Sequence, residues 1–216
     1  MRTRHWPLFD LVVRTPRLEL RYPDDELVVA AADLAIQGVH DAASMPFGIP
    51  WTDAPPGEQE RNSLQHYWLT RATWTRDDWK CPLVVLVDGA VAGAQGLHAT
   101  RFPLAREFET GSWLGREFQG RGIGKEMRAA VLHLGFAGLG AQRATTGAFH
   151  DNQPSLHVTA ALGYEPNGDA LHPRRDGVDR QLKFVMTRAR WEERRRDDIE
   201  IEGLEPCLEM FGASTS

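Results

Sequence analysis

The sequence predicts an α/β protein (α+β) whose central sheet is mixed, largely antiparallel, about seven strands wide and flanked by helices. A hairpin rich in β-branched residues at 82–93 is followed by alternating strand and helix patterns over 110–162. Such an order favours helices on both faces of the sheet. With 216 residues and 42% hydrophobic composition, the chain is large enough to bury a core without metal or disulfide support. We therefore expect one domain over residues 1–216.

Extended segments are indicated by β-branched residues, by alternation of apolar and polar side chains, and by turn residues at their ends. These criteria predict strands at residues 11–13, 18–21, 82–87, 91–93, 110–114, 143–149 and 180–187. Thr15-Pro16 separates the first two strands, because proline restricts the residue before it to extended geometry. Asp88-Gly89 supplies the two-residue turn of the hairpin.

Helices are indicated by capping residues and by apolar residues spaced three and four apart. They are expected at residues 24–38, 58–74, 123–138 and 152–162. The clearest stripe consists of Ile123, Met127, Ala130, Val131 and Leu134. Four prolines exclude a regular helix from 45–56, which we expect to be an ordered loop, and 102–106 is expected to be a second loop.

Composition excludes several classes of function. A formal net charge of -5 gives no general reason to bind nucleic acid. The sequence contains no leader-like start and no apolar stretch of membrane length, so we expect a cytoplasmic protein without membrane contact. Cys81 and Cys207 are far apart, and neither they nor the histidines show metal-ligand spacing, so no disulfide and no metal are expected.

A glycine-rich turn precedes the clearest helix. Gly120, Gly122 and Gly124 lie between a predicted strand and the helix start, with Arg121 and Lys125 beside them. The spacing fits neither a Walker loop nor a dinucleotide-binding fingerprint. Unpaired amides at a helix N-terminus favour an anion, so the segment is a candidate phosphate site. The alternative is that the glycines only form a tight turn.

Four segments resemble the GNAT superfamily of acyltransferases. Residues 119–124 match its pattern Gln/Arg-x-x-Gly-x-Gly/Ala, and 109–114 resembles the Glu-x-Gly-aromatic-Trp-Leu strand of its ribosomal-protein N-terminal acetyltransferases, with Ser112 in place of the aromatic residue. Residues 152–164 and 15–21 are similar to two further segments of the family. The resemblance covers about residues 15–190 and leaves 191–216 as a C-terminal extension.

This resemblance implies acyl transfer from acetyl-CoA, or from succinyl-CoA, directly to a primary amine of a protein or small molecule. It implies that acyl-CoA is bound by the following residues: Trp113, Leu114, Gln119, Gly120, Arg121, Gly122, Ile123, Gly124, Lys125, Asn152 and Ser155. Phosphates would lie on the glycine turn, and the pantetheine would pair with the strand before it.

The catalytic groups are less clearly indicated. Thr159 occupies the position where many family members have a tyrosine that protonates the leaving thiolate, so Ser155 is the expected acid. Glu109 is the expected base, because period-two alternation places it on one strand face with Trp113. His98 and Asp151 are weaker alternatives for the base. The missing tyrosine leaves open a second hypothesis, a non-catalytic domain that binds or senses acyl-CoA.

Acceptor recognition is expected from the irregular loop, through Phe47 and Trp51, with His98 nearby. The tail is a separate case. Residues 198–202 alternate charged and apolar side chains, and apolar residues follow them. We expect this tail either to cover the subunit's own sheet or to join the interface of a homodimer or larger homo-oligomer, and favour the interface.

Overall fold

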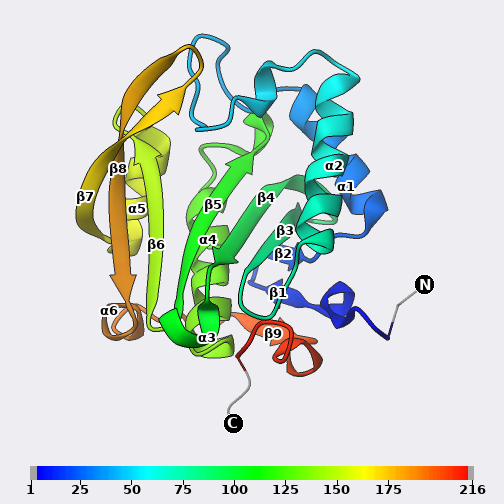
Figure 1. Cartoon of the computed structure of the whole chain (residues 1–216), viewed down its shortest axis with the longest axis vertical. Helices are drawn as coiled ribbons and strands as arrows, with labels where there is room; N and C mark the ends of the chain where they lie inside the picture. The colour runs from blue at the N-terminus through cyan, green and yellow to red at the C-terminus, as the bar shows by residue number, and fades with distance from the viewer. Residues whose placement is uncertain (1–3, 214–216) are drawn as a thin grey trace.

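The computed structural model describes residues 4–213 and contains one nine-stranded sheet in the order β7-β8-β6-β5-β4-β3-β2-β1-β9 (Figure 1). The strands are β1 (Val12–Arg14), β2 (Leu18–Arg21), β3 (Trp79–Val87), β4 (Ala90–Ala99), β5 (Glu107–Leu114), β6 (Arg143–Phe149), β7 (Glu165–Arg174), β8 (Gly177–Thr187) and β9 (Glu200–Glu202). Every neighbouring pair is antiparallel except β5 and β6. The mixed, largely antiparallel sheet is confirmed, and β7 and β9 extend it beyond the seven strands expected.

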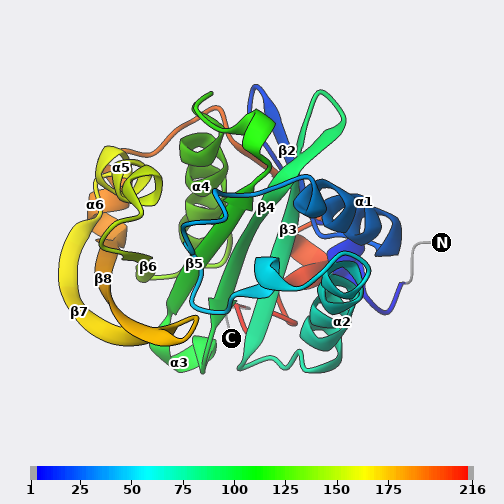
Figure 2. The same cartoon turned by 90° about the horizontal axis from the view of Figure 1, so that it is seen from above.

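Helices flank the sheet on both faces (Figure 2). They are α1 (Asp25–Ile36), α2 (Glu58–Ala72), α3 (Phe102–Ala105), α4 (Ile123–His133), α5 (Gln153–Leu162) and α6 (Arg188–Glu192). Short 3-10 turns occur at Pro7–Asp10, Trp51–Asp53, Arg116–Phe118 and Glu205–Cys207, and Leu134–Gly138 is a π-helical turn. The expected loop at 102–106 is therefore wrong in part, because most of it forms the single turn α3. None of the described helices is long and apolar enough to cross a membrane.

The predicted apolar stripe of α4 forms the centre of the core. Each of its five residues, from Ile123 to Leu134, is at most 3% exposed. They belong to one cluster with the inner side chains of β2 and β3, including Leu20 and Leu83. This packing fixes α4, and hence the glycine turn at its start, against the sheet.

The strands β5 and β6 run parallel and separate half-way along β5. Their register extends only from Glu107 opposite Arg143 to Thr110 opposite Thr146. Beyond that point β5 pairs only with β4, and β6 only with β8, as the diverging arrows of Figure 1 show. Residues 111–114 therefore have one backbone edge without a strand partner.

The C-terminal tail packs on its own chain. Ile201 of β9 pairs with Val13 of β1, and Phe211 is 0% exposed. The ring of Phe211 lies 4.9 Å from that of Trp79, whose indole nitrogen donates to the carbonyl oxygen of Phe211 at 3.2 Å. The tail thus packs on the subunit's own sheet, which is the first of the two placements expected for it. A contribution of the tail to a subunit interface stays a prediction, as does the oligomeric state.

We predict that Phe211→Ala lowers the free energy of unfolding by about 3–5 kcal/mol, as expected for truncating a fully buried aromatic ring. The matched control is Val178→Ala, at a side chain that is 67% exposed, which should change stability by less than about 0.5 kcal/mol. Urea denaturation followed by tryptophan fluorescence measures both. Equal stability of the two variants would contradict the packing of the tail.

Candidate active site

The glycine turn is held against the end of β5 by one side chain. Gln119 donates both amide protons of its side chain, to the carbonyl oxygen of Leu114 at 2.9 Å and to that of Val39 at 2.7 Å. These two bonds tie the turn to β5 and to the segment after α1. Since both protons are used within the protein, we assign Gln119 to positioning the turn rather than to contacting a ligand.

The backbone of the turn is open to a ligand. Gly120 and Gly122 have φ values of +71° and +78°, in the left-handed region that favours glycine. A Cβ at Gly120 would meet no atom within 4 Å, and one at Gly122 would meet only the guanidinium of Arg17 at 3.5 Å. The first amides of α4 have no partner in the preceding turn of helix, and the side chains of Arg121 and Lys125 are exposed beside them. Geometry and charge thus suit a phosphate group.

Ile123 and Gly124 occupy the first turn of α4 but present different groups. The side chain of Ile123 is buried in the core, so only its backbone can meet a ligand. Gly124 lies at the crossing with α5, where an added Cβ would be 3.6 Å from Val158 and 3.8 Å from Leu114. The start of α4, the end of β5 and the first turns of α5 therefore meet at one place.

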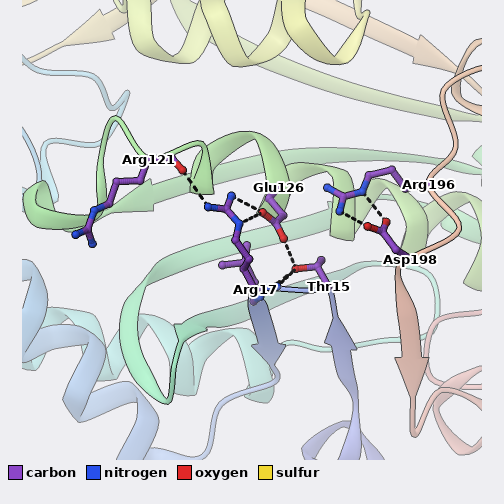
Figure 3. A network of polar contacts seen from close by, with 7 residues as sticks. Thr15, Arg17, Arg121, Glu126, Arg196 and Asp198 are labelled. Atoms are coloured by element: carbon purple, nitrogen blue, oxygen red, sulfur yellow. Dashed lines mark hydrogen bonds and ion pairs between the residues drawn. The ribbon is translucent and has the colours of Figure 1, made fainter.

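An ion pair that sequence reasoning missed anchors the same helix start (Figure 3). Arg17, the residue before β2, donates from Nε to Glu126 Oε2 at 2.7 Å and from Nη1 to the carbonyl oxygen of Arg121 at 3.2 Å. Thr15 donates from its hydroxyl to Glu126 Oε1 at 2.6 Å. Burial raises the pKa of Glu126, but the bonds from Thr15 and Arg17 outweigh it and hold this pKa below its usual range. Thr15 and Arg17 thus fix the start of α4, beside the candidate phosphate site.

The beginning of α5 carries the expected acid. Asn152 is the N-cap, and its side-chain oxygen accepts from the amide of Ser155 at 3.3 Å. Asn152 thus caps this helix, and its expected contact with acyl-CoA stays a prediction. Ser155 is half-buried, and its carbonyl oxygen accepts from the hydroxyl of Thr159 at 2.8 Å. The Ser155 hydroxyl therefore lies one helical turn before Thr159, near the meeting point of α4, α5 and β5.

A cavity of about 670 Å³ lies between α1, α2 and the facing surfaces of β3, β4 and β5. Phe47, Trp51 and Trp113 form one wall, with ring centroids 5.2 Å apart for the first pair and 5.8 Å for the second. His98 also lines the cavity. The structure thus brings together the residues expected at the acceptor site, and Trp113 on β5 connects the cavity with the unpaired strand edge.

The loop that lines one end of the cavity is held by a distant part of the chain. Arg174, near the tip of the β7–β8 hairpin, donates to the carbonyl oxygen of Met45 at 2.7 Å. Arg175 binds Asp53 through two bonds of 2.7 and 2.8 Å and donates to the carbonyl oxygen of Ala42 at 3.0 Å. These contacts join the hairpin to the loop that carries Phe47, and Figure 1 shows the two segments meeting above the sheet.

Glu109 and His98 face each other on neighbouring strands. They are register partners of β5 and β4, with 3.4 Å between His98 Nε2 and Glu109 Oε2. The hydrogen bond from His98 lowers the pKa of Glu109, and this effect exceeds the opposing effect of burial. A carboxylate with a lowered pKa is a weaker base, so the structure favours the pair over Glu109 alone.

The third candidate base is engaged elsewhere. Asp151 forms an ion pair with Arg174 at 3.0 Å, and Arg174 also binds Asp179 at 2.6 Å. Both carboxylates lie near His150 in a group whose ligand atoms fall within 4.8 Å of one another. Because the guanidinium already compensates the two acids, we assign no metal to this group.

Comparison with known proteins identifies the fold. Residues 17–165, well over half of the chain, match the model of the acetyltransferase (GNAT) domain. The chain belongs to the GNAT acetyltransferase family. As a GNAT protein it is an acyl-CoA-dependent N-acetyltransferase, which agrees with the resemblance found in the sequence.

Three solved GNAT structures are similar to this chain. RimJ of Mycobacterium smegmatis, in complex with a CoA disulfide, has a TM-score of 0.69 at 19% identity, covering 94% of this chain and 95% of that one. The ribosomal-protein-S5-alanine acetyltransferase of Vibrio fischeri has a TM-score of 0.62 at 21% identity, covering 83% and 98%. RimL, a ribosomal L7/L12 α-N-protein acetyltransferase in complex with coenzyme A, has a TM-score of 0.62 at 19% identity, covering 82% and 97%. At these identities the similarity supports the fold.

We predict that Arg17→Met lowers the free energy of unfolding by about 1–3 kcal/mol at pH 7, because buried Glu126 loses its charged partner. Arg21→Met in β2 is the control, since Glu19, the partner of Arg21, keeps a second partner in Arg14, and exposed pairs of this kind contribute about 0–1 kcal/mol.

The same variant should show a characteristic pH dependence. The pKa of Glu126 is lowered in the folded protein, so its stabilising contribution is complete above the ordinary glutamate pKa of about 4.3 and is lost as pH falls through the folded-state pKa. Urea denaturation at pH 7 and at acid pH should therefore show the Arg17→Met deficit shrinking on acidification. A deficit that is independent of pH would contradict the assignment.

We predict that Gly122→Val weakens acetyl-CoA binding by at least about tenfold, because its side chain would occupy the open surface of the turn and strain a left-handed residue. Gly140→Val is the matched control, with a φ of +71° and no atom within 4 Å of the added Cβ, but at the far end of the α4 segment. Calorimetry measures affinity in both variants. Equal affinities would exclude the turn as the phosphate site.

Proposed function

We propose that this GNAT protein transfers an acetyl group from acetyl-CoA to the amine of a flexible protein N-terminus or of a small molecule. The observation that carries the proposal is the cavity, walled by aromatic rings, beside the unpaired edge of β5. Bonds from Arg174 and Arg175 to residues 42–53 hold in place the loop whose Phe47 and Trp51 line this cavity. A recessed space of this kind suits a narrow, flexible chain or a compact molecule better than a side chain on a flat protein surface. The similarity to ribosomal-protein acetyltransferases supports the N-terminal alternative.

The donor site follows from the backbone around α4. The pyrophosphate of CoA would be held by the amides at the start of α4, with Arg121 and Lys125 alongside. Pantetheine would pair with the unpaired edge of β5 at residues 111–114, which places the thioester near Trp113 and Leu114. An amide of this edge would then stabilise the oxyanion that develops as the amine attacks.

The proton of the attacking amine needs an acceptor on the cavity side. His98 lines the cavity and contacts Glu109, so the imidazole would take the proton while the carboxylate orients it and compensates its charge. On the opposite side of the reacting carbon, the Ser155 hydroxyl would protonate the sulfur. The amine is acylated directly, without a covalent enzyme intermediate.

The cavity wall selects against basic acceptors. Among the described residues that line it, none is an aspartate or glutamate, while Lys80, His66 and His98 are present. Burial lowers the pKa of His66, and Lys80 adds to this effect, so His66 is neutral near pH 7. We therefore favour an acceptor whose body is apolar or acidic. Lys80 is also the cation that would meet the carboxylate of succinyl-CoA, which stays the alternative donor.

Release of CoA thiol tests the proposal. Purified protein would be mixed with acetyl-CoA or succinyl-CoA and with three amine classes: short N-terminal peptides, small amines and a lysine-bearing folded protein. We expect turnover with acetyl-CoA and one of the first two classes. Binding of acyl-CoA without turnover by any amine would favour the sensing domain instead. We also propose that the protein is a cytoplasmic homo-oligomer. Light scattering on the full chain tests the oligomeric state, and fractionation of cells tests the location.

We predict that His98→Gln lowers kcat/KM by about 10²-fold or more, which is the usual contribution of a general base. Glu109→Gln should lower it less, because the imidazole then loses only the carboxylate that orients it and compensates its charge. If Glu109 acted alone, Glu109→Gln would instead abolish the reaction while His98→Gln left it nearly unchanged. Stopped-flow thiol detection across pH 5–9 distinguishes the two results.

A further inference from the structure

A buried arginine lies beneath the point where β5 and β6 separate. Arg128, in the second turn of α4, is 4% exposed. Its Nη1 donates to the hydroxyl of Thr159 on α5 at 2.9 Å, and its Nη2 contacts the hydroxyl of Ser112 on β5 at 3.4 Å. The buried Nε has no acceptor. The guanidinium therefore lies between α5 and the stretch of β5 that has an unpaired edge.

No anion compensates this cation within residues 4–213. None of the ion pairs formed by the described residues includes Arg128. Burial lowers its pKa, and the group that opposes this is Tyr164, a buried phenol whose own pKa is raised by burial. Glu126, the nearest acid along α4, is bound by Arg17. A buried charge without a partner costs several kcal/mol, so its retention calls for an explanation.

The neighbours of Arg128 point to the reaction centre. Ser112 lies in the stretch of β5 that has no partner on the β6 side, and Thr159 is one helical turn after Ser155. Thr159 accepts from Arg128 and donates to the carbonyl oxygen of Ser155, so its only hydroxyl proton is already used. Thr159 thus cannot replace the missing tyrosine as a proton donor, whereas the guanidinium beside it still has an unused N–H.

We propose that Arg128 stabilises the CoA thiolate electrostatically, which supplies part of what the absent tyrosine would provide. The step rests on the proposed function. The amine nitrogen bonds to the thioester carbon, and its proton passes to the His98–Glu109 pair. The C–S bond then breaks with its electron pair on sulfur, and the charge of Arg128 compensates that anion until Ser155 or water protonates it.

The test is the pKa of the thiol of CoA bound to the full-length protein, followed by thiolate absorbance near 240 nm. A cation within about 4–6 Å lowers the pKa of an acid by about 1–3 units, so we expect a shift of that size relative to free CoA. Arg128→Met should abolish the shift, Arg128→Lys should keep part of it, and Ser155→Ala should leave it in place. Calorimetry establishes that each variant binds CoA.

Kinetics give a second readout. Arg128→Met should lower kcat by about tenfold or more while changing the Kd of acetyl-CoA by less than about threefold, because the charge acts on sulfur only as the bond breaks. A wild-type protein that binds CoA with the thiol pKa of the free molecule would overturn the inference, even if Arg128→Met fails to fold. An equal shift in wild type and Arg128→Met would also overturn it. A wild-type protein that does not bind CoA would overturn the proposed function as well.

Discussion

The separation of β5 from β6 is the constraint on which the site depends. The two strands are the single parallel pair of the sheet, and their pairing ends at Thr110 and Thr146. Each strand is stabilised beyond this point by its outer neighbour, β4 or β8, so the sheet can open without losing either strand. The opening leaves one backbone edge of β5 without a strand partner over residues 111–114. It also places the start of α4, the start of α5 and the cavity around a common point.

Contacts from other parts of the chain hold the start of α4 beside that opening. Gln119 fixes the turn to the end of β5, and Arg17 reaches from β2 to Glu126 and to the backbone of Arg121. These bonds use side chains beside the phosphate site but leave the glycine backbone open. On the other side of the sheet, Arg175 likewise binds the loop that carries Phe47 and Trp51 and does not itself line the cavity. The site is thus kept open by groups that bind the protein rather than the ligand.

Local pattern predicted the parts of the fold in which one segment determines its own structure. The stripe of α4, the hairpin turn at Asp88-Gly89 and the helix expected at 152–162 depend on neighbours in sequence, and the structure shows each of them. β7 was missed, because it is mostly exposed and its register breaks between Pro166 and Asp169, so no alternation marks it. The sequence left the packing of the tail open, because an apolar row looks the same whether its own sheet or a second subunit covers it.

The site residues that sequence reasoning missed share one property, which is a partner far away in the chain. Arg17 and Glu126 are 109 positions apart, and Arg128 and Thr159 are 31 apart. A signal was present in each case, since Glu126 and Arg128 are charged residues in a helix segment that also carries the apolar stripe. Charged side chains that lie beside such a stripe are brought close to the core, where they are seldom buried without partners. The sequence alone does not identify those partners.

The two buried charges of α4 show how stability and function divide along one helix. Glu126 and Arg128 are two positions apart, so they point away from each other and cannot form an ion pair. Glu126 receives a cation from β2, and the pair fixes the helix to the sheet. Arg128 receives only hydroxyl groups, although its neighbours Met127 and Ala130 show that apolar residues fit this helix. A position selected for stability alone would favour such an apolar residue, because replacing a buried charge by a well-packed apolar side chain is often stabilising. The unpaired cation therefore lowers the stability of the fold, and we infer that it is kept because it serves the proposed reaction.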